Sequence, residues 1–275
     1  MNKEADLHLH SIYSDGTFTP TEILNYAKEL SLSCISITDH DTVNGLDEAF
    51  KAAAELDIEL IPGIELSSSY KRKEIHILGY FIDYKAEWFL DKLKSFRRSR
   101  KLRFLEMVKK LRERGIEVDY EKILNDNPQA AIGRLHLGKA VYEEGHASSI
   151  REVFDRYLGD GKTCCVEKEE LSILDAIEMI KRLGGISILA HPYLLRDDNM
   201  VAELLDIGFS GIEALYLGHS KGMEKNYIKM AREKGLLISG GSDCHGKAKD
   251  NILMGKKKIP YEVVIKMKEY LDDKE

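Results

Sequence analysis

The stretch ADLHLHSIYSDG, residues 5–16, decides the fold, because it joins a short apolar strand to a cluster of histidine and aspartate side chains. His8 and His10 stand two residues apart in it, so a β-strand places both imidazoles on the same face. Asp15 follows in the loop sequence SDG. The stretch therefore predicts a buried strand that leads into a polar site.

Short apolar runs like this one recur along the chain and alternate with segments of helical period. We expect helices at residues 20–30, 46–56, 173–183 and 221–234, the first of which begins at a proline. The seven predicted strands are residues 5–9, 34–37, 58–61, 75–81, 186–189, 211–215 and 236–239. This alternation is typical of β/α units around a parallel sheet and predicts an α/β fold.

The alternation breaks between residues 86 and 164, where helical periodicity runs without a buried strand. SFRRSRKLRFLEMVKKLRERG, residues 95–115, is typical of a long amphipathic helix that ends at a glycine. GRLHLGKAVYEEG and SIREVFDRYLG predict two more helices. We therefore expect a barrel formed by residues 1–85 and 165–275, with residues 86–164 as an inserted helical domain.

The overall composition describes a mildly acidic globular protein. Its 275 residues are 43% hydrophobic and carry a net charge of −6, which excludes a disordered chain and a polybasic membrane binder. Four cysteines are too few to form a disulfide framework in a chain of this length, so we expect a reducing compartment, the cytoplasm. The expected partners include no membrane, no DNA-binding module and no obligate protein.

One window departs from the acidic average. Residues 92–114 contain eleven basic and two acidic side chains, a local charge of +9 that leaves −15 for the rest. Two interpretations remain open: a solvated helix face opposite an apolar stripe, or a surface that attracts an anionic substrate.

Metal-binding residue types recur at or near the ends of the predicted strands. The motif TDHD follows the second strand, PGIE the third, AHP the fifth and SDCH the seventh. Because strand ends converge on one face of a β/α barrel, we expect these side chains to meet. The nine candidates are His8, His10, Asp15, His40, Glu65, His76, His191, Asp243 and His245.

Six imidazoles and three carboxylates form a mixed nitrogen and oxygen donor set that suits Mn, Fe or Zn. Nine donors exceed the needs of one ion with about four to six ligands, so the pattern predicts two or three divalent ions. Two cations that share a carboxylate generate a hydroxide from a bridging water near neutral pH. No serine or cysteine nucleophile is then required.

The series HLHSIYSDG, TDHD, GIE, HILGY, AHP and SDCHG resembles the motifs of the PHP (polymerase and histidinol phosphatase) family, in the same order. The resemblance implies a metal-dependent phosphoesterase with a distorted (β/α)7 barrel. It assigns a first metal to His8, His10, Glu65 and Asp243, a second to Glu65, His76 and His191, and a third to Asp15, His40 and His245. In this assignment Glu65, His191 and Asp243 hold a metal-bridging hydroxide.

The inserted segment narrows the resemblance to the TrpH-like branch of that family. Members of this branch remove the 3′-phosphate of nucleoside 3′,5′-bisphosphates or degrade short 5′-phosphorylated RNA from the 5′ end. The resemblance implies that Arg134, His136 and His219 approach the substrate phosphate. Leu135 departs from the branch, whose members usually carry proline in the motif GRPH.

Three alternatives stay open at the level of sequence. The first is a phosphatase for another small phosphomonoester, such as histidinol phosphate. The second is an amidohydrolase-like C–N hydrolase, since HxH on a first strand also occurs in those barrels. The third is a non-catalytic nucleic-acid-binding module stabilised by metal.

Overall fold

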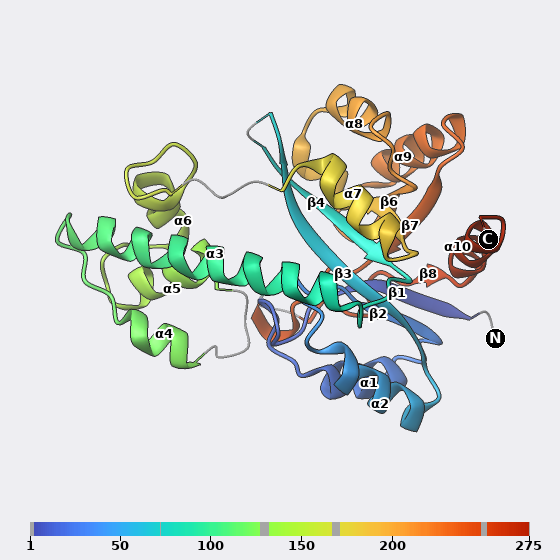
Figure 1. Ribbon diagram of the computed structural model, residues 1–275, viewed down its shortest axis with the longest axis horizontal. Coiled ribbons are helices and arrows are strands. Elements are labelled where there is room, and N and C mark those ends of the chain that lie inside the picture. The colour runs from blue at the N-terminus through green and yellow to red at the C-terminus, as the bar shows by residue number, and fades with distance from the viewer. Residues whose placement is uncertain (1–2, 72, 127–131, 167–170, 249–251, 275) are drawn as a thin grey trace. The chain divides into compact units, whose positions relative to one another are not determined.

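The computed structural model describes residues 3–71, 73–126, 132–166, 171–248 and 252–274. The chain divides into two compact units. The first, the barrel unit, consists of Met1–Leu90 and Glu170–Glu275, and the second, the helical unit, consists of Asp91–Glu169. Figure 1 labels most of the helices and strands of each unit.

The barrel unit is built on one sheet, which has eight strands among the described residues. The strands are β1 (Glu4–Leu9), β2 (Cys34–Ile37), β3 (Glu59–Tyr70), β4 (Lys73–Tyr80), β5 (Ile186–Leu189), β6 (Gly211–Tyr216), β7 (Leu237–Gly241) and β8 (Ile259–Pro260). They lie in the order β7-β6-β5-β4-β3-β2-β1-β8. Leu9 also pairs with Cys244, just beyond β7, so the sheet curves into a nearly closed barrel. The predicted α/β barrel is therefore confirmed.

Strand β4 departs from the predicted parallel arrangement. β1, β2 and β3 are parallel, as are β5, β6 and β7, but β4 is antiparallel to both of its neighbours. Tyr70 pairs with Lys73 at the tip of a tight hairpin, whereas a parallel return would need a crossover of about a dozen residues or more. The expectation of a wholly parallel sheet is wrong at this strand.

Strand β3 is also longer than the predicted strand at residues 58–61. It continues to Tyr70 because Gly63–Tyr70 forms a ladder with β4, so Glu65 lies inside a strand and not in a loop beyond it. Gly63 permits the close approach of β2, since a Cβ atom there would lie 2.2 Å from the hydroxyl of Ser36. The short apolar run underestimated the strand because Pro62 and Gly63, which often mark the end of a strand, follow it directly.

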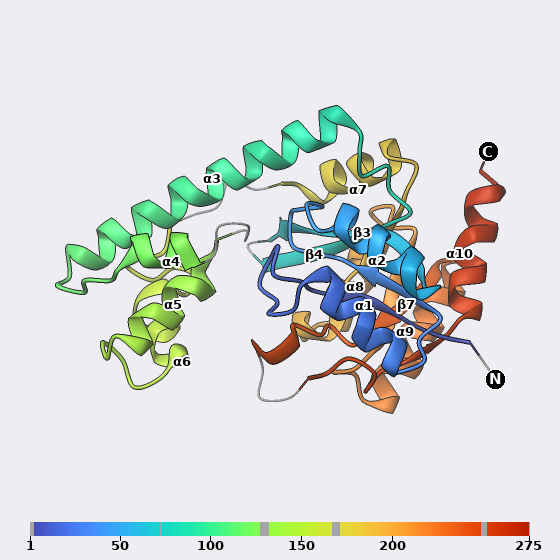
Figure 2. The same cartoon turned by 90° about the horizontal axis from the view of Figure 1, so that it is seen from below.

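Helices cover the strands of the barrel unit. They are α1 (Pro20–Glu29), α2 (Leu46–Leu56), α7 (Ile173–Arg182), α8 (Asp198–Leu205), α9 (Lys221–Glu233) and α10 (Glu262–Asp272). The first begins in a capping box, in which Thr19 and Glu22 satisfy each other's backbone N–H groups. α1 contacts α2 (Figure 2), and α10 contacts β7 and β8. The predicted helices match α1, α2, α7 and α9, while α8, α10 and β8 were not predicted.

The helical unit lies between β4 and β5 in the sequence. It contains most of α3 (Glu87–Arg112), together with α4 (Tyr120–Asp126), α5 (Arg134–Glu143), α6 (Ile150–Val153) and a π-helical turn (Phe154–Leu158). Gly115 follows α3 with φ 74°, a conformation that favours glycine. Its apolar core includes Phe104, Leu111, Leu137 and Val153, each shielded from solvent. The unit therefore has a core of its own.

Candidate metal centre

The centre begins with the first strand of the barrel. His8 and His10 lie on one face of the β1 segment, and neither side chain is exposed to solvent. Their Nε2 atoms are 3.1 Å apart, so the Nε2 atoms of both rings point into the same small region. Two imidazole nitrogens this close are a favourable arrangement for a shared cation.

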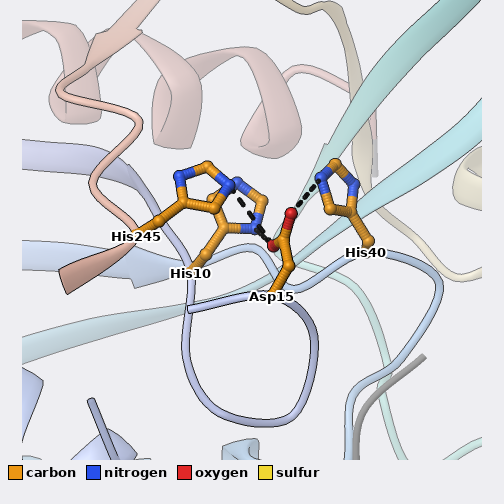
Figure 3. Close-up of side chains that lie close together, drawn as sticks. All are labelled: His10, Asp15, His40 and His245. Atoms are coloured by element: carbon orange, nitrogen blue, oxygen red, sulfur yellow. Dashed lines mark ion pairs between the residues drawn. The ribbon is translucent and has the colours of Figure 1, made fainter. Parts of the chain in front are cut away.

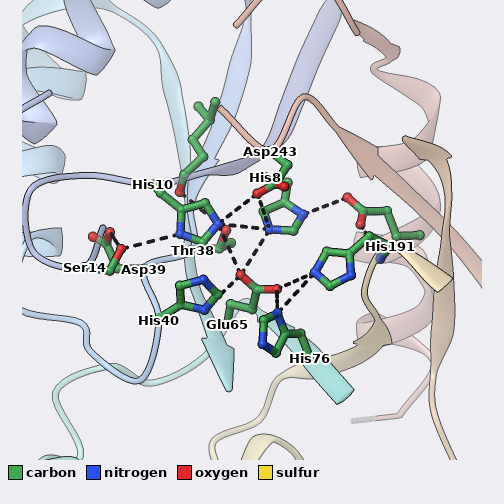
Figure 4. A network of polar contacts seen from close by, with 12 residues as sticks. His8, His10, Ser14, Thr38, Asp39, His40, Glu65, His76, His191 and Asp243 are labelled. Atoms are coloured by element: carbon green, nitrogen blue, oxygen red, sulfur yellow. Dashed lines mark hydrogen bonds and ion pairs between the residues drawn. The ribbon is translucent and has the colours of Figure 1, made fainter. Parts of the chain in front are cut away.

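Glu65 lies at the middle of the centre, with imidazole rings around it (Figure 4). Its Oε2 atom is 3.2 Å from His8 Nε2, 3.1 Å from His10 Nε2 and 3.2 Å from His40 Nδ1. Its Oε1 atom is 2.9 Å from both His76 Nδ1 and His191 Nε2. The two oxygens of one carboxylate thus face different sets of histidines, which is the geometry a bridging ligand needs.

Asp243 approaches the first of these sets from the segment after β7. Its Oδ1 atom is 3.2 Å from His10 Nε2 and 3.5 Å from His8 Nε2. The hydroxyl of Tyr216 donates a hydrogen bond of 2.8 Å to Oδ2. One oxygen therefore faces the histidines while the other is held by a neighbouring strand.

Asp15 forms a second focus, between His245 and His10 on one side and His40 on the other (Figure 3). Its Oδ1 atom is 3.3 Å from His245 Nε2 and 3.7 Å from His10 Nδ1, and its Oδ2 atom is 3.8 Å from His40 Nε2. These distances are longer than those around Glu65. The focus at Asp15 is therefore the looser of the two.

The structure brings all nine predicted metal-binding side chains together in four overlapping groups. In each group one donor atom from every member lies within 4.8 Å of the others. The groups are His8, His10 and Asp243; His8, Glu65 and His191; His40, Glu65 and His76; and His10, Asp15, His40 and His245.

Two buried atoms of the centre, Asp15 Oδ1 and His40 Nδ1, form no hydrogen bond within the described residues. Burying polar atoms that lack hydrogen bonds is costly, and a cation would satisfy their lone pairs. The donor set therefore fits divalent metal ions.

The proton affinities in the centre reflect this crowding of charges. Burial lowers the pKa of His10, but hydrogen bonds and charge from Asp243 and Glu65 outweigh burial and raise it to about 10. Burial likewise lowers the pKa of His76, but Glu65 raises it to about 10. Burial alone would raise the pKa of Glu65, yet the histidines hold it well below its usual range. Ionised carboxylates thus attract positive charge into the centre.

Neighbouring carboxylates hold the loops that carry these side chains. Asp39 accepts hydrogen bonds from the N–H of Ser11 at 2.7 Å and from the hydroxyl of Ser14 at 2.6 Å, so it ties down the loop that leads to Asp15. Asp41 accepts a hydrogen bond of 2.8 Å from the N–H of Ser67 on β3. Neither belongs to the four donor groups.

Glu213 is a member of the centre that the sequence analysis missed. It lies on β6 with no exposed surface, and its carboxylate contacts the side chain of His8 and the backbone of His191. An available signal was overlooked, because Glu213 is an ionisable residue within the apolar run GIEALY.

The three residues predicted to approach the substrate lie in different units. His219 belongs to the barrel unit, where its Nδ1 atom is 2.9 Å from the carbonyl of Ala214 and its buried Nε2 atom forms no hydrogen bond within the described residues. Arg134 and His136 belong to α5 of the helical unit. Arg134 forms an ion pair with Asp160, and His136 Nδ1 accepts a hydrogen bond of 3.3 Å from the N–H of Gly133.

A histidine and carboxylate centre on the strands of an α/β barrel defines the class of metal-dependent hydrolases. Within this class the chain belongs to the PHP domain family, whose model matches residues 6–159. It is therefore a metal-dependent phosphoesterase of the PHP type.

Individual relatives agree with this assignment. A 5′-3′ exoribonuclease of Haemophilus influenzae is 35% identical over 89% of this chain and 91% of its own length. A 3′,5′-nucleoside bisphosphate phosphatase of Chromobacterium violaceum is 34% identical over 87% of this chain and 86% of its own length. A solved structure described as a metal-dependent phosphoesterase, from Bifidobacterium adolescentis, superposes with a TM-score of 0.83 at 27% identity and covers 96% of this chain and 94% of its own.

Among the described residues, none of the helices has the length and apolar character needed to span a membrane.

Proposed function

We propose that the protein hydrolyses the 3′-phosphate of nucleoside 3′,5′-bisphosphates, short 5′-phosphorylated RNA, or both. The observation that carries the proposal is Glu65, a buried carboxylate whose two oxygens each face a different set of histidines. The names of the Haemophilus and Chromobacterium relatives support this choice of substrates. The proposal includes a cytoplasmic location, supported by four cysteines that are all free thiols.

The nine clustered side chains are the proposed ligands of two or three ions of Mn, Fe or Zn. We assign His8, His10, Glu65 and Asp243 to one ion, Glu65, His76 and His191 to a second, and Asp15, His40 and His245 to a third. When bound, ions that share a carboxylate supply an activated water and positive charge for the phosphoryl oxygens.

The protein's own groups orient this chemistry. Glu65 fixes the spacing of the two principal sets, because its oxygens are held by His10 on one side and His76 on the other. Asp243 faces His10 and His191 faces Glu65 Oε1, and with Glu65 they would help to hold the activated water. Glu65, His10 and His191 are buried whereas His76 and Asp243 are partly exposed, so bulk water has only limited access to the centre.

We further propose that the helical unit serves as a substrate cap. The guanidinium of Arg134 suits bidentate contact with a phosphate, and the basic residues 92–114 would attract an anion. His219 is a second proposed contact, since its free Nε2 atom can donate or accept a hydrogen bond. His136 is the third, by resemblance alone.

A substrate screen with manganese tests the proposal. The panel contains nucleoside 3′,5′-bisphosphates, 5′-phosphorylated oligoribonucleotides, histidinol phosphate and a set of amides. We expect kcat/KM to be highest for one of the first two, and Glu65→Gln to abolish that activity. His146→Ala, which changes a histidine outside the donor groups, serves as the matched control. Preference for histidinol phosphate or an amide would reject the proposed substrates.

A further inference from the structure

Glu213 is a carboxylate that no donor group requires, yet it is entirely buried at the centre of the barrel. A buried charge is costly unless hydrogen bonds satisfy it. Both oxygens of Glu213 are used, and both contacts reach proposed metal ligands. The residue therefore has a role other than packing.

The first contact fixes the ring of His8. Glu213 Oε1 lies 2.9 Å from His8 Nδ1, while His8 Nε2 points to Glu65 Oε2 at 3.2 Å. Because a carboxylate accepts, the Nδ1 atom of His8 is the one that carries the hydrogen of this bond. The lone pair of Nε2 is then left to face the donor group.

The second contact fixes the backbone of His191. This residue has φ 24° and ψ 60°, an uncommon conformation for a side chain with a Cβ atom. Its N–H donates a hydrogen bond of 2.7 Å to Glu213 Oε2. In this conformation His191 Nε2 lies 2.9 Å from Glu65 Oε1. Glu213 thus supports the strained turn that aims the ring.

Strand β6 is built to present this carboxylate. The pairing with β7 shifts between Glu213 and Leu215, so the strand contains a bulge. In a regular strand Glu213 and Tyr216 would lie on opposite faces, whereas here Tyr216 also reaches the centre and binds Asp243. The bulge thus lets one strand support two sides of the centre.

We propose that Glu213 is a positioning residue for the metal centre, which holds His8 with its Nδ1 atom protonated and holds the backbone of His191. One carboxylate thereby aligns ligands that face opposite oxygens of Glu65. The inference rests on the ligand assignment proposed above. It assigns no role in the chemical step to Glu213 itself.

Three variants, studied with zinc alone, test the proposal. Glu213→Gln keeps the shape but replaces one acceptor oxygen by an NH₂ group, so it cannot accept from both His8 and His191. Glu213→Asp keeps the charge but is one methylene too short to reach both. Tyr80→Phe is the matched control, because it removes a buried hydrogen bond to the carbonyl of Leu7 without touching a proposed ligand. Zinc affinity is measured by competition with a chromophoric chelator.

We expect zinc affinity to fall about 10- to 100-fold in both Glu213 variants and to stay within about threefold of wild type in Tyr80→Phe. Full affinity in Glu213→Asp would show that charge alone matters and would overturn the positioning role. Full affinity in Glu213→Gln would also overturn it. An equal loss in Tyr80→Phe would trace the effect to general destabilisation and reject the proposal.

A spectroscopic readout is independent of whether the variants fold. In zinc-loaded wild-type protein with nitrogen-15 histidine, His8 should show a protonated Nδ1 atom in a long-range proton–nitrogen correlation. An unprotonated Nδ1 would overturn the proposal. His8→Ala separates the two hypotheses: if it binds zinc as wild type does, the ligand assignment fails, and if it loses zinc while Glu213→Gln does not, only the role of Glu213 fails.

Discussion

The interiors of the two units are chemically opposite. Every described side chain that is both buried and polar or charged belongs to the barrel unit, including the fully buried His8, His10, Glu65 and Glu213. The core of the helical unit is entirely apolar, from Phe104 to Cys164. Burying these polar groups lowers the stability of the barrel unit unless cations bind them. The helical unit is instead stabilised by the burial of apolar side chains.

The largest effect is expected at the centre of the polar interior. Glu65→Gln removes the charge that all five surrounding histidines face, so it should lower kcat/KM on the order of 10⁴-fold, about 5 kcal/mol. Metal analysis after reconstitution with manganese should show fewer ions per chain. Glu48→Gln, which changes a half-buried carboxylate bonded to Thr21 outside the donor groups, is the control and should behave as wild type. Full activity in Glu65→Gln would contradict the bridging role.

The second prediction tests whether the two interiors are separate. Phe104→Ala should destabilise the helical unit by about 3–5 kcal/mol, because Phe104 is fully buried in its apolar core. In urea, far-ultraviolet circular dichroism should gain an early transition. The fluorescence of Trp88, the single tryptophan and part of the barrel unit, should not shift, and metal content should be unchanged.

The exposed Leu102 on the same helix provides the control for that experiment. Leu102→Ala should alter stability by no more than about 0.5 kcal/mol. If circular dichroism and Trp88 fluorescence instead show the same transition in Phe104→Ala, the two units unfold cooperatively. The difference between their interiors would then not correspond to separate stabilities.

The sequence predicted the fold well where local pattern determines it. Apolar runs located β1, β2, β5, β6 and β7 to within a few residues, because each is short and mostly buried. It misjudged the length of β3 and the direction of β4, since the residues of β3 past Ile61 pair with β4 across the hairpin. Nonlocal pairing of that kind leaves no local period to read.

The candidate site followed the same rule. Histidines and carboxylates near strand ends predicted all nine members of the donor groups, since strand ends must converge in a barrel. Glu213 was overlooked although it is an ionisable residue within an apolar run, whereas Tyr216 was missed because it reaches the centre through a bulge in β6 that no pattern in the sequence announces. The roles of Arg134, His136 and His219 stay predictions.

The third prediction concerns the surface of the helical unit. Arg134→Ala should lower kcat/KM for a nucleoside 3′,5′-bisphosphate. The loss of transition-state stabilisation should be about 1.5–3 kcal/mol, as expected for one charged contact to phosphate. Arg134→Lys should recover only part of the loss, since lysine lacks the planar fork. Steady-state kinetics of both variants measure the effect.

The ion pair of Arg134 with Asp160 offers a structural explanation that the same experiment must separate. Asp160→Asn weakens that pair and leaves the guanidinium in place, so it should retain activity if Arg134 acts on substrate. Equal losses in Asp160→Asn and Arg134→Ala would assign Arg134 to the fold of the helical unit. Arg134 would then stabilise the helical unit and not bind substrate, and the proposal that this unit is a substrate cap would lose its main support.

The smallest effect is expected at the rim of the polar interior. Tyr216→Phe removes the hydroxyl that donates to Asp243 Oδ2 and leaves the ring packed against His8 and His219. We expect zinc affinity and kcat/KM to fall about tenfold, about 1.4 kcal/mol, at the low end for a group that orients a ligand. Tyr227→Phe, whose hydroxyl binds Asp198 away from the donor groups, should leave both values unchanged. If Tyr216→Phe lowers the free energy of unfolding but not the zinc affinity, the hydroxyl of Tyr216 stabilises the fold. This part of the polar interior would then not orient a metal ligand.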